Sequence, residues 1–171
     1  MHTHILNNRP TEVIPLPEPI IGVRLFNIDR NRLLLQSLAI RKADYWLPGE
    51  IKESVCNNSP KHGHIEPVAD CSCGIWSCTS RRGLIQSFPA SVLFQKNTDD
   101  NYFGYWSSYV PYICARIEQW GIVIKHEWGY RSQYARIIPE SICWWPRSYG
   151  RTQTKLLDHI REKYSDKLQR S

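Results

Sequence analysis

The sequence has no long apolar run. In its 171 residues no stretch of about 18 consecutive apolar residues occurs, so no transmembrane helix is predicted. Residues 1–9 hold no apolar core of the kind that a signal peptide carries, which argues against secretion by that route. We therefore expect a cytoplasmic protein that makes no membrane contact.

Several common functional motifs are missing as well. The chain has no glycine-rich phosphate loop, no nucleophile elbow and no helix-turn-helix pattern, so ordinary nucleotide-dependent enzymes and serine hydrolases gain no support. We also find no internal repeat and no low-complexity tract. What is present, 42% hydrophobic and 22% charged residues, is typical of one folded domain with a buried core.

The net charge of +6 is unevenly distributed. Residues 147–171 contain seven Lys or Arg residues against three acidic ones. Such a segment favours polyanionic partners, although basic charge often serves only solubility. Apolar residues recur in this segment at the three- and four-residue spacing of a helix: Leu156, Leu157, Ile160, Tyr164 and Leu168. We predict a basic amphipathic helix over 151–171.

The middle of the chain shows the period-two alternation of strands. Predicted strands lie at 20–28, 33–40, 51–55, 74–78, 113–126 and 130–138, with a last extended piece at 139–146 and a short helix after Ser80. Four prolines between Pro10 and Pro19 predict an extended arm over 1–19, outside any strand ladder. We expect an α+β domain over 20–150, mostly antiparallel β in a curled sheet or partly open barrel, with a zinc-binding loop and a C-terminal helix.

Cysteine and histidine are concentrated between Cys56 and Cys78, a stretch that holds four of the six cysteines and two of the six histidines. In a cytosolic chain this clustering indicates metal rather than disulfides. Cys71 and Cys73, two apart on an extended backbone, project to one face. A tetrahedral zinc ion takes four thiolate or imidazole ligands. The predicted structural site comprises Cys56, His64, Cys71 and Cys73, with His62 as the substitute imidazole. The alternative is that these cysteines are small apolar core residues.

The same segment has a second interpretation. His64-x-Glu66-Pro67 followed by Cys71-x-Cys73 resembles the H-x-E…P-C-x-x-C signature of zinc deaminases. The two cysteines are one residue too close for that signature, and only four residues separate Glu66 from Cys71. If Cys56 is not a ligand, three ligands with Glu66 as general acid and base would suit a zinc-dependent hydrolase or deaminase-like enzyme.

A hairpin and a loop form the second candidate site. Thirteen of the twenty aromatic residues lie between Tyr102 and Tyr149, interleaved with basic residues that could neutralise phosphates while the rings stack on bases. The candidate binding residues are His126, Glu127, Trp128, Tyr130 and Arg131 at the hairpin tip and Tyr105 and Trp106 in a long loop. Two ordinary explanations remain open: cross-strand pairing on a solvated hairpin and aromatic packing in a β core.

Two sequence blocks resemble a scattered family of small uncharacterised bacterial proteins. The blocks are C-S-C-G-I-W at 71–76 and W-G-I-V-I-K-H-E-W-G-Y-R-S-Q-Y-A at 120–135, supported by W-L-P-G-E at 46–50. The family has a C-x-C-G-I-aromatic box and an H-E-x-G-Y-R hairpin, and the resemblance covers about residues 22–140. It implies that Cys56, His64, Cys71, Cys73 and the Glu127 hairpin are signature residues. Ser77 and Ser132 stand where the pattern has alanine.

The resemblance supplies no activity. From the residues we expect a non-enzymatic zinc-stabilised binding or adaptor module whose aromatic and basic surface contacts nucleic acid or a protein complex. The alternatives are a zinc-dependent enzyme, using Glu66 or Glu127, and a module for protein–protein interaction alone.

Overall fold

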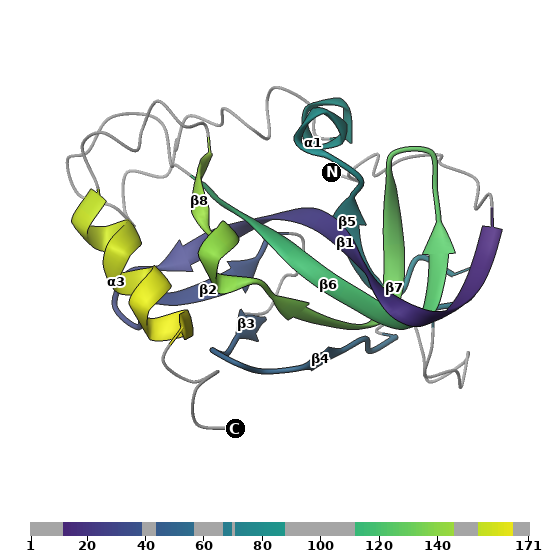
Figure 1. Cartoon of the computed structure of the whole chain (residues 1–171), viewed down its shortest axis with the longest axis horizontal. Coiled ribbons are helices and arrows are strands. Elements are labelled where there is room, and N and C mark those ends of the chain that lie inside the picture. Colours follow the sequence, from purple (N-terminus) through teal and green to yellow (C-terminus); the bar gives the residue numbers. More distant parts are fainter. Residues whose placement is uncertain are drawn as a thin grey trace.

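The computed structural model describes residues 12–38, 44–56, 67–69, 71–87, 112–145 and 154–165. In order, the elements are β1 (Glu12–Asp29), β2 (Leu34–Ser37), β3 (Tyr45–Trp46), β4 (Lys52–Glu53), β5 (Ile75–Cys78), α1 (Arg81–Ser87), β6 (Tyr112–Lys125), β7 (Gly129–Ile137), the 3-10 turn η1 (Pro139–Ser141), β8 (Cys143–Trp145) and α3 (Thr154–Ser165). The strands pair antiparallel, and α3 lies at one end of the molecule (Figure 1). The predicted α+β class is therefore confirmed. None of the helices in these ranges is long and apolar enough to cross a bilayer.

Four strands form a closed ring. β1 pairs with β5, β5 with β7, β7 with β6, and β6 again with β1. The sequence predicts a curled sheet or a partly open barrel, and the structure shows that the ring closes. Register shifts between Leu16 and Ile20 in β1, and between Trp120 and Val123 in β6, bend the strands enough for this. Gly121, with a φ of +77°, lies in the second irregularity.

The first strand begins at Glu12 rather than at Ile20. Residues 12–16 pair with residues 121–125 of β6, so the prediction that the prolines keep this stretch out of a ladder is wrong. A proline lacks only the N–H donor and can lie where that donor is not needed. The register shift between Leu16 and Ile20 leaves Pro17 and Pro19 outside the pairing. Residues 1–11 of the predicted arm lie outside the described residues.

The main core lies between the sheet and α3. It contains Phe26 of β1, Ile113 of β6 and Trp144 of β8, packed with Leu157 and Ile160 of α3. The helix therefore shares the core of the strands, on the apolar face that its periodicity predicts. A smaller core lies under α1, and Ser80 caps that helix as predicted, its hydroxyl accepting from the Gly83 amide at 3.1 Å.

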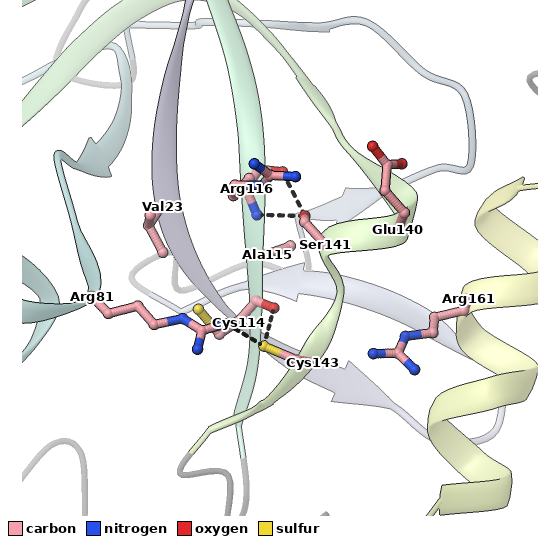
Figure 2. A pocket seen from close by; sticks show the side chains of 9 residues that line it. All are labelled: Val23, Arg81, Cys114, Ala115, Arg116, Glu140, Ser141, Cys143 and Arg161. Atoms are coloured by element: carbon pink, nitrogen blue, oxygen red, sulfur yellow. Dashed lines mark hydrogen bonds between the residues drawn. The ribbon is translucent and has the colours of Figure 1, made fainter.

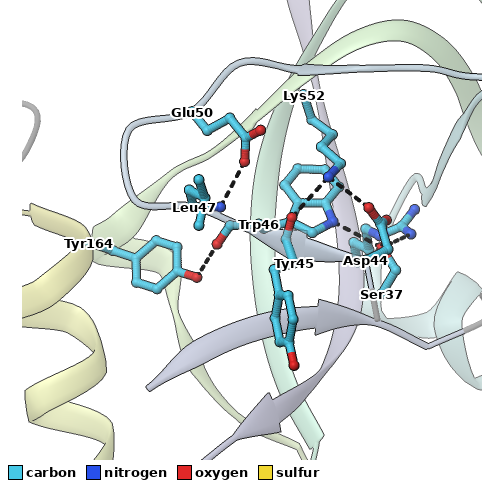
Figure 3. A network of polar contacts seen from close by, with 9 residues as sticks. Ser37, Asp44, Tyr45, Trp46, Leu47, Glu50, Lys52 and Tyr164 are labelled. Atoms are coloured by element: carbon cyan, nitrogen blue, oxygen red, sulfur yellow. Dashed lines mark hydrogen bonds and ion pairs between the residues drawn. The ribbon is translucent and has the colours of Figure 1, made fainter. Parts of the chain in front are cut away.

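Polar contacts fix the β2–β3 edge to α3 (Figure 3). The Tyr164 hydroxyl accepts from the Leu35 amide at 2.9 Å and donates to the Trp46 carbonyl. Ser37 Oγ accepts from the Trp46 indole at 2.9 Å and donates to Asp44 at 2.8 Å. The Tyr164 contacts and the Trp46–Ser37 bond are buried, whereas the bond to Asp44 is part-buried, and together they specify where α3 and β3 lie.

Candidate metal centre

Three cysteine sulfurs meet beside the ring. Cys56 follows β4, whereas Cys71 and Cys73 precede β5, and all three Sγ atoms lie within 4.8 Å of one another. Cys56 Sγ and Cys71 Sγ are 3.6 Å apart. Two sulfurs bound to one tetrahedral ion at about 2.3 Å would lie about 3.8 Å apart, whereas a disulfide bond is about 2.05 Å long. None of the six cysteines forms a disulfide. The three thiols are therefore close enough to hold a metal ion.

The structure thus brings together three of the four predicted ligands. The fourth, His64, and its substitute His62 lie outside the described residues, as does Glu66 of the enzyme alternative. The imidazole ligand therefore remains a prediction. Cys78, Cys114 and Cys143 do not join the cluster.

Gly74 determines how the chain leaves the cysteines. Its φ of +110° lies in the region that L side chains rarely adopt. A Cβ at this position would lie 3.0 Å from Pro67 Cβ and 3.1 Å from Arg131 Cβ. The glycine of the C-x-C-G box is thus required by backbone conformation and by space, because the chain turns here from Cys73 into β5.

Arg131 of β7 holds the backbone of the cysteine loop. Its Nη1 donates to the carbonyls of Cys71 and Cys73, the latter at 2.8 Å, and its Nη2 donates to the Val68 carbonyl at 3.2 Å. The residue is only 2% exposed. One buried guanidinium therefore fixes the carbonyls on both sides of Ser72 and positions the two thiols.

His126 and Trp76 complete this arrangement. Arg131 Nε donates to His126 Nε2 at 2.9 Å, which makes that nitrogen an acceptor and the imidazole neutral. The His126 ring stacks on Trp76 with centroids 5.0 Å apart, and the guanidinium carbon of Arg131 lies 5.1 Å from the Trp76 centroid. His126 and Arg131 thus pack against the Trp76 ring beside the cysteine loop.

The charge of Arg131 lacks a carboxylate partner in the described part of the chain, where the ion pairs involve other residues. A buried cation needs a compensating anion. Burial lowers the pKa of Arg131, while Cys73 and Cys71 act to raise it. Burial, followed by the contact with Cys71, raises the pKa of Cys73 to about 11. Crowded thiols of this kind give up their protons when a metal ion replaces them.

The predicted binding residues divide into two groups. His126 and Arg131 are each 2% exposed, so a partner resting on the surface would not touch them. Glu127 is exposed, and Trp128 and Tyr130 are half-buried at the hairpin tip, where a partner could reach them. Tyr105 and Trp106 lie outside the described residues. Arg131 is buried because the cysteine loop covers it, which strand periodicity does not reveal.

A buried amide in the ring is a feature that the sequence prediction missed. Gln119 is fully buried, and its Nε2 donates to the Ile75 carbonyl at 2.9 Å and to Ser132 Oγ at 2.7 Å, while its Oε1 accepts from Ser77 Oγ. The absence of a side chain at Gly22 makes room for this hydrogen-bond network, because a Cβ at that position would lie 2.0 Å from Ser77 Oγ. Ser77 and Ser132 stand where the resemblance predicts alanine, and together they could have indicated a buried polar partner.

Comparison with known proteins adds no relative: no family model, no curated protein and no solved structure matches the chain. The resemblance to the bacterial family therefore stays a prediction. What the geometry defines is a β-rich domain with a group of three cysteines that could hold a metal ion.

Proposed function

We propose that this chain is a non-enzymatic binding module stabilised by a structural zinc ion. Cys56, Cys71 and Cys73 are three of the ligands, and His64 is the fourth. The proposal is supported by the three clustered sulfurs and by Arg131, a buried cation whose hydrogen bonds go to carbonyls and His126 and which interacts electrostatically with Cys73 and Cys71. A zinc ion with three thiolates has a net charge of −1, which pairs with the guanidinium.

Zinc suits these ligands because thiolates prefer it to the hard cations. Three thiolates and an imidazole would fill a tetrahedral shell and leave no position for a reactive water. Such a closed site is structural rather than catalytic. It would join the end of β4 to the start of β5, and so fix both ends of the intervening segment against the ring.

Metal analysis tests this proposal. We expect one zinc ion per chain in the purified protein, lost in Cys56→Ser and Cys73→Ser and retained in the control Cys78→Ser, whose thiol lies outside the cluster. His64→Ala and His62→Ala identify the imidazole. A folded Cys56→Ser variant that keeps its zinc would contradict the closed site and favour the enzyme alternative.

The proposed partner is single-stranded nucleic acid, contacted at the hairpin tip. There Trp128 and Tyr130 are half-buried and Lys125 is exposed, a combination that can stack on bases and neutralise a phosphate. Fluorescence anisotropy with a labelled oligonucleotide should show binding that weakens steeply with salt. Trp128→Ala and Lys125→Gln should weaken it more than Arg30→Gln, which removes an equal charge from the turn after β1. Absence of binding at low salt would eliminate this partner.

A protein partner is the second candidate, and a different surface favours it. Leu47, Ile51 and Val55 are 49%, 56% and 71% exposed along the segment that leads into Cys56. Exposed apolar residues gathered in one segment are typical of interaction sites. If a protein is the partner, a Val55→Asp variant with normal zinc content should lose a co-purifying protein that Glu53→Gln retains.

A further inference from the structure

A cavity separate from the metal centre lies between the sheet, α1 and α3. Its volume is about 430 Å³, within the range of small-molecule sites. The polar residues that line it are Arg81, Arg116, Glu140, Ser141, Cys143 and Arg161 (Figure 2). None of these belongs to the cysteine cluster or to the group formed by Trp76, His126 and Arg131.

Three of the lining residues are arginines from three different elements. Arg81 belongs to α1, Arg116 to β6 and Arg161 to α3. Figure 2 shows Arg81 and Arg161 extending toward the cavity from opposite sides. Glu140 supplies the one carboxylate in the lining, which leaves the wall with a net charge of +2.

The positive charge is only weakly compensated. Arg81 Nη2 donates to the Cys143 thiol at 3.0 Å. Arg161 Nε donates to the Ile142 carbonyl at 2.8 Å, and its Nη1 lies 3.8 Å from the exposed carboxylate of Asp158. Within the described ranges, neither Arg81 nor Arg116 forms an ion pair. An anion that entered the cavity would therefore not have to displace a carboxylate from either group.

The walls are fixed by the fold. Ser141 Oγ accepts from the Arg116 amide at 2.7 Å and donates to the Ile138 carbonyl at 2.6 Å, which holds η1 against β6. Cys143 lies opposite Cys114 in the β6–β8 pairing. The arginines thus project from elements that the sheet already positions, and binding would require little ordering of the backbone.

We propose that this cavity binds the phosphate group of a small molecule, with Arg81, Arg116 and Arg161 as the binding residues. A phosphate monoester carries a charge of about −1.5 to −2 at pH 7, which matches the net charge of the lining. A carboxylate would neutralise only half of it. Guanidinium groups also fit phosphate oxygens in bidentate geometry. The remaining volume, with Val23 and Ala115 as apolar wall, is available to the rest of the ligand.

Calorimetry on the full chain tests the proposal with phenyl phosphate, inorganic phosphate and benzoate. We expect phenyl phosphate to bind at least tenfold more tightly than benzoate, which has the same ring but a single charge. Tighter binding of phenyl phosphate than of inorganic phosphate would identify an organic phosphate as the ligand, whereas equal affinities would identify free phosphate. Absence of binding by both phosphates would overturn the proposal.

Arg116→Gln is the main variant, because the side chain is exposed and its loss should leave the fold intact. It should weaken phosphate binding about tenfold, the loss of one charge-assisted contact. Arg30→Gln removes an equal charge outside the lining and should change affinity less than twofold. Equal losses in both variants would mean that general charge, not this cavity, attracts the anion. Zinc content should be unchanged in each, so failure here is distinguishable from failure of the metal proposal.

Alkylation of Cys143 gives an independent measurement. A positively charged cavity should make Cys143 react faster with anionic iodoacetate, relative to neutral iodoacetamide, than a free thiol in solution does. Mass spectrometry measures the extent of alkylation at Cys143 with each reagent. Arg116→Gln should reduce this preference, and phenyl phosphate should slow the reaction several-fold. A rate ratio equal to that of the free thiol, with no protection by phenyl phosphate, would contradict a phosphate site.

Discussion

Two arginines, Arg131 buried and Arg24 partly buried, contact the same tryptophan from different strands. Arg24 of β1 donates through Nη1 to the Trp76 carbonyl and through Nη2 to Ser37 Oγ at 3.0 Å, but its buried Nε has no partner in the described structure. Arg131 of β7 lies against the Trp76 ring and uses all three of its nitrogens. β5 is therefore held on both sides by guanidinium groups.

The two arginines differ in what compensates their charge. Burial lowers the pKa of Arg24 to about 10, and the carboxylate of Asp44, followed by the Cys78 thiol outside the cluster, opposes that shift. For Arg131 the opposing groups are Cys73 and Cys71. One side of β5 thus depends on an ordinary carboxylate network, whereas the other depends on thiols that a metal ion would keep ionised. Only the Arg131 side should therefore respond to metal.

Replacing Arg131 should have the largest effect. Arg131→Met leaves three carbonyls and the thiol cluster without their cation, and we expect the free energy of unfolding to fall by about 3–5 kcal/mol. Zinc content should fall with it. Urea denaturation and metal analysis measure both. Arg24→Met, the matched control, should lower the free energy of unfolding less and should keep its zinc. An equal loss of zinc in both variants would contradict the proposed difference between the two sides of β5.

Metal removal should give the next largest effect. An ion bound at about 100 times its Kd contributes about 2.7 kcal/mol, and 1 kcal/mol shifts the Tm of a chain of this size by about 2–4 °C. A chelator should therefore lower the Tm by about 5–10 °C in the wild type and in Arg24→Met. In Arg131→Met and Cys73→Ser the chelator should have no effect, as thermal denaturation would show.

Gly74→Ala should destabilise the cysteine side more moderately. The positive φ and the contact with Pro67 are expected to cost about 1–3 kcal/mol. Because the strain lies between Cys73 and β5, zinc affinity should fall as well, measured by competition with a chromophoric chelator. If the variant is destabilised but its zinc affinity is unchanged, Gly74 stabilises the four-stranded ring and does not position the metal ligands.

The smallest effect should come from Tyr164→Phe, which removes the hydroxyl that bridges Leu35 and Trp46. Loss of this bridge should cost about 1–2 kcal/mol in urea denaturation, because two buried backbone groups lose a partner. Zinc content should not change, since the contact lies on the Arg24 side. A parallel loss of zinc would show that α3 and the cysteine cluster are coupled.

Sequence patterns predict the local parts of this structure well. Alternation indicates most strands, Ser80 identifies the start of α1, and the four-residue period identifies the buried face of α3. Cys56, Cys71 and Cys73 were identified because soft ligands are rare and clustered. Each of these features depends on neighbours in the sequence, so a single chain suffices to find them.

The non-local parts were not predictable in this way. Closure of the ring depends on pairing between β1 and β6, which are far apart in the sequence, and on bulges that allow residues 12–16 to join despite the prolines. In the sequence, Arg131 has the pattern of a solvent-facing cation on a hairpin, because its burial depends on the cysteine loop, which is distant in the sequence. The polar network of Gln119 likewise requires β5, β6 and β7 to be assembled first.

The closed ring has one short junction. β5 pairs with β1 through the single register Val23–Cys78, while β1 and β6 share a long ladder. Of the four pairings in the ring this one has the fewest register pairs, so separating β5 from β1 would break the fewest ladder hydrogen bonds. Since Cys71 and Cys73 directly precede β5, a bound ion would anchor this strand. Amide hydrogen exchange in β5 would then report on zinc occupancy.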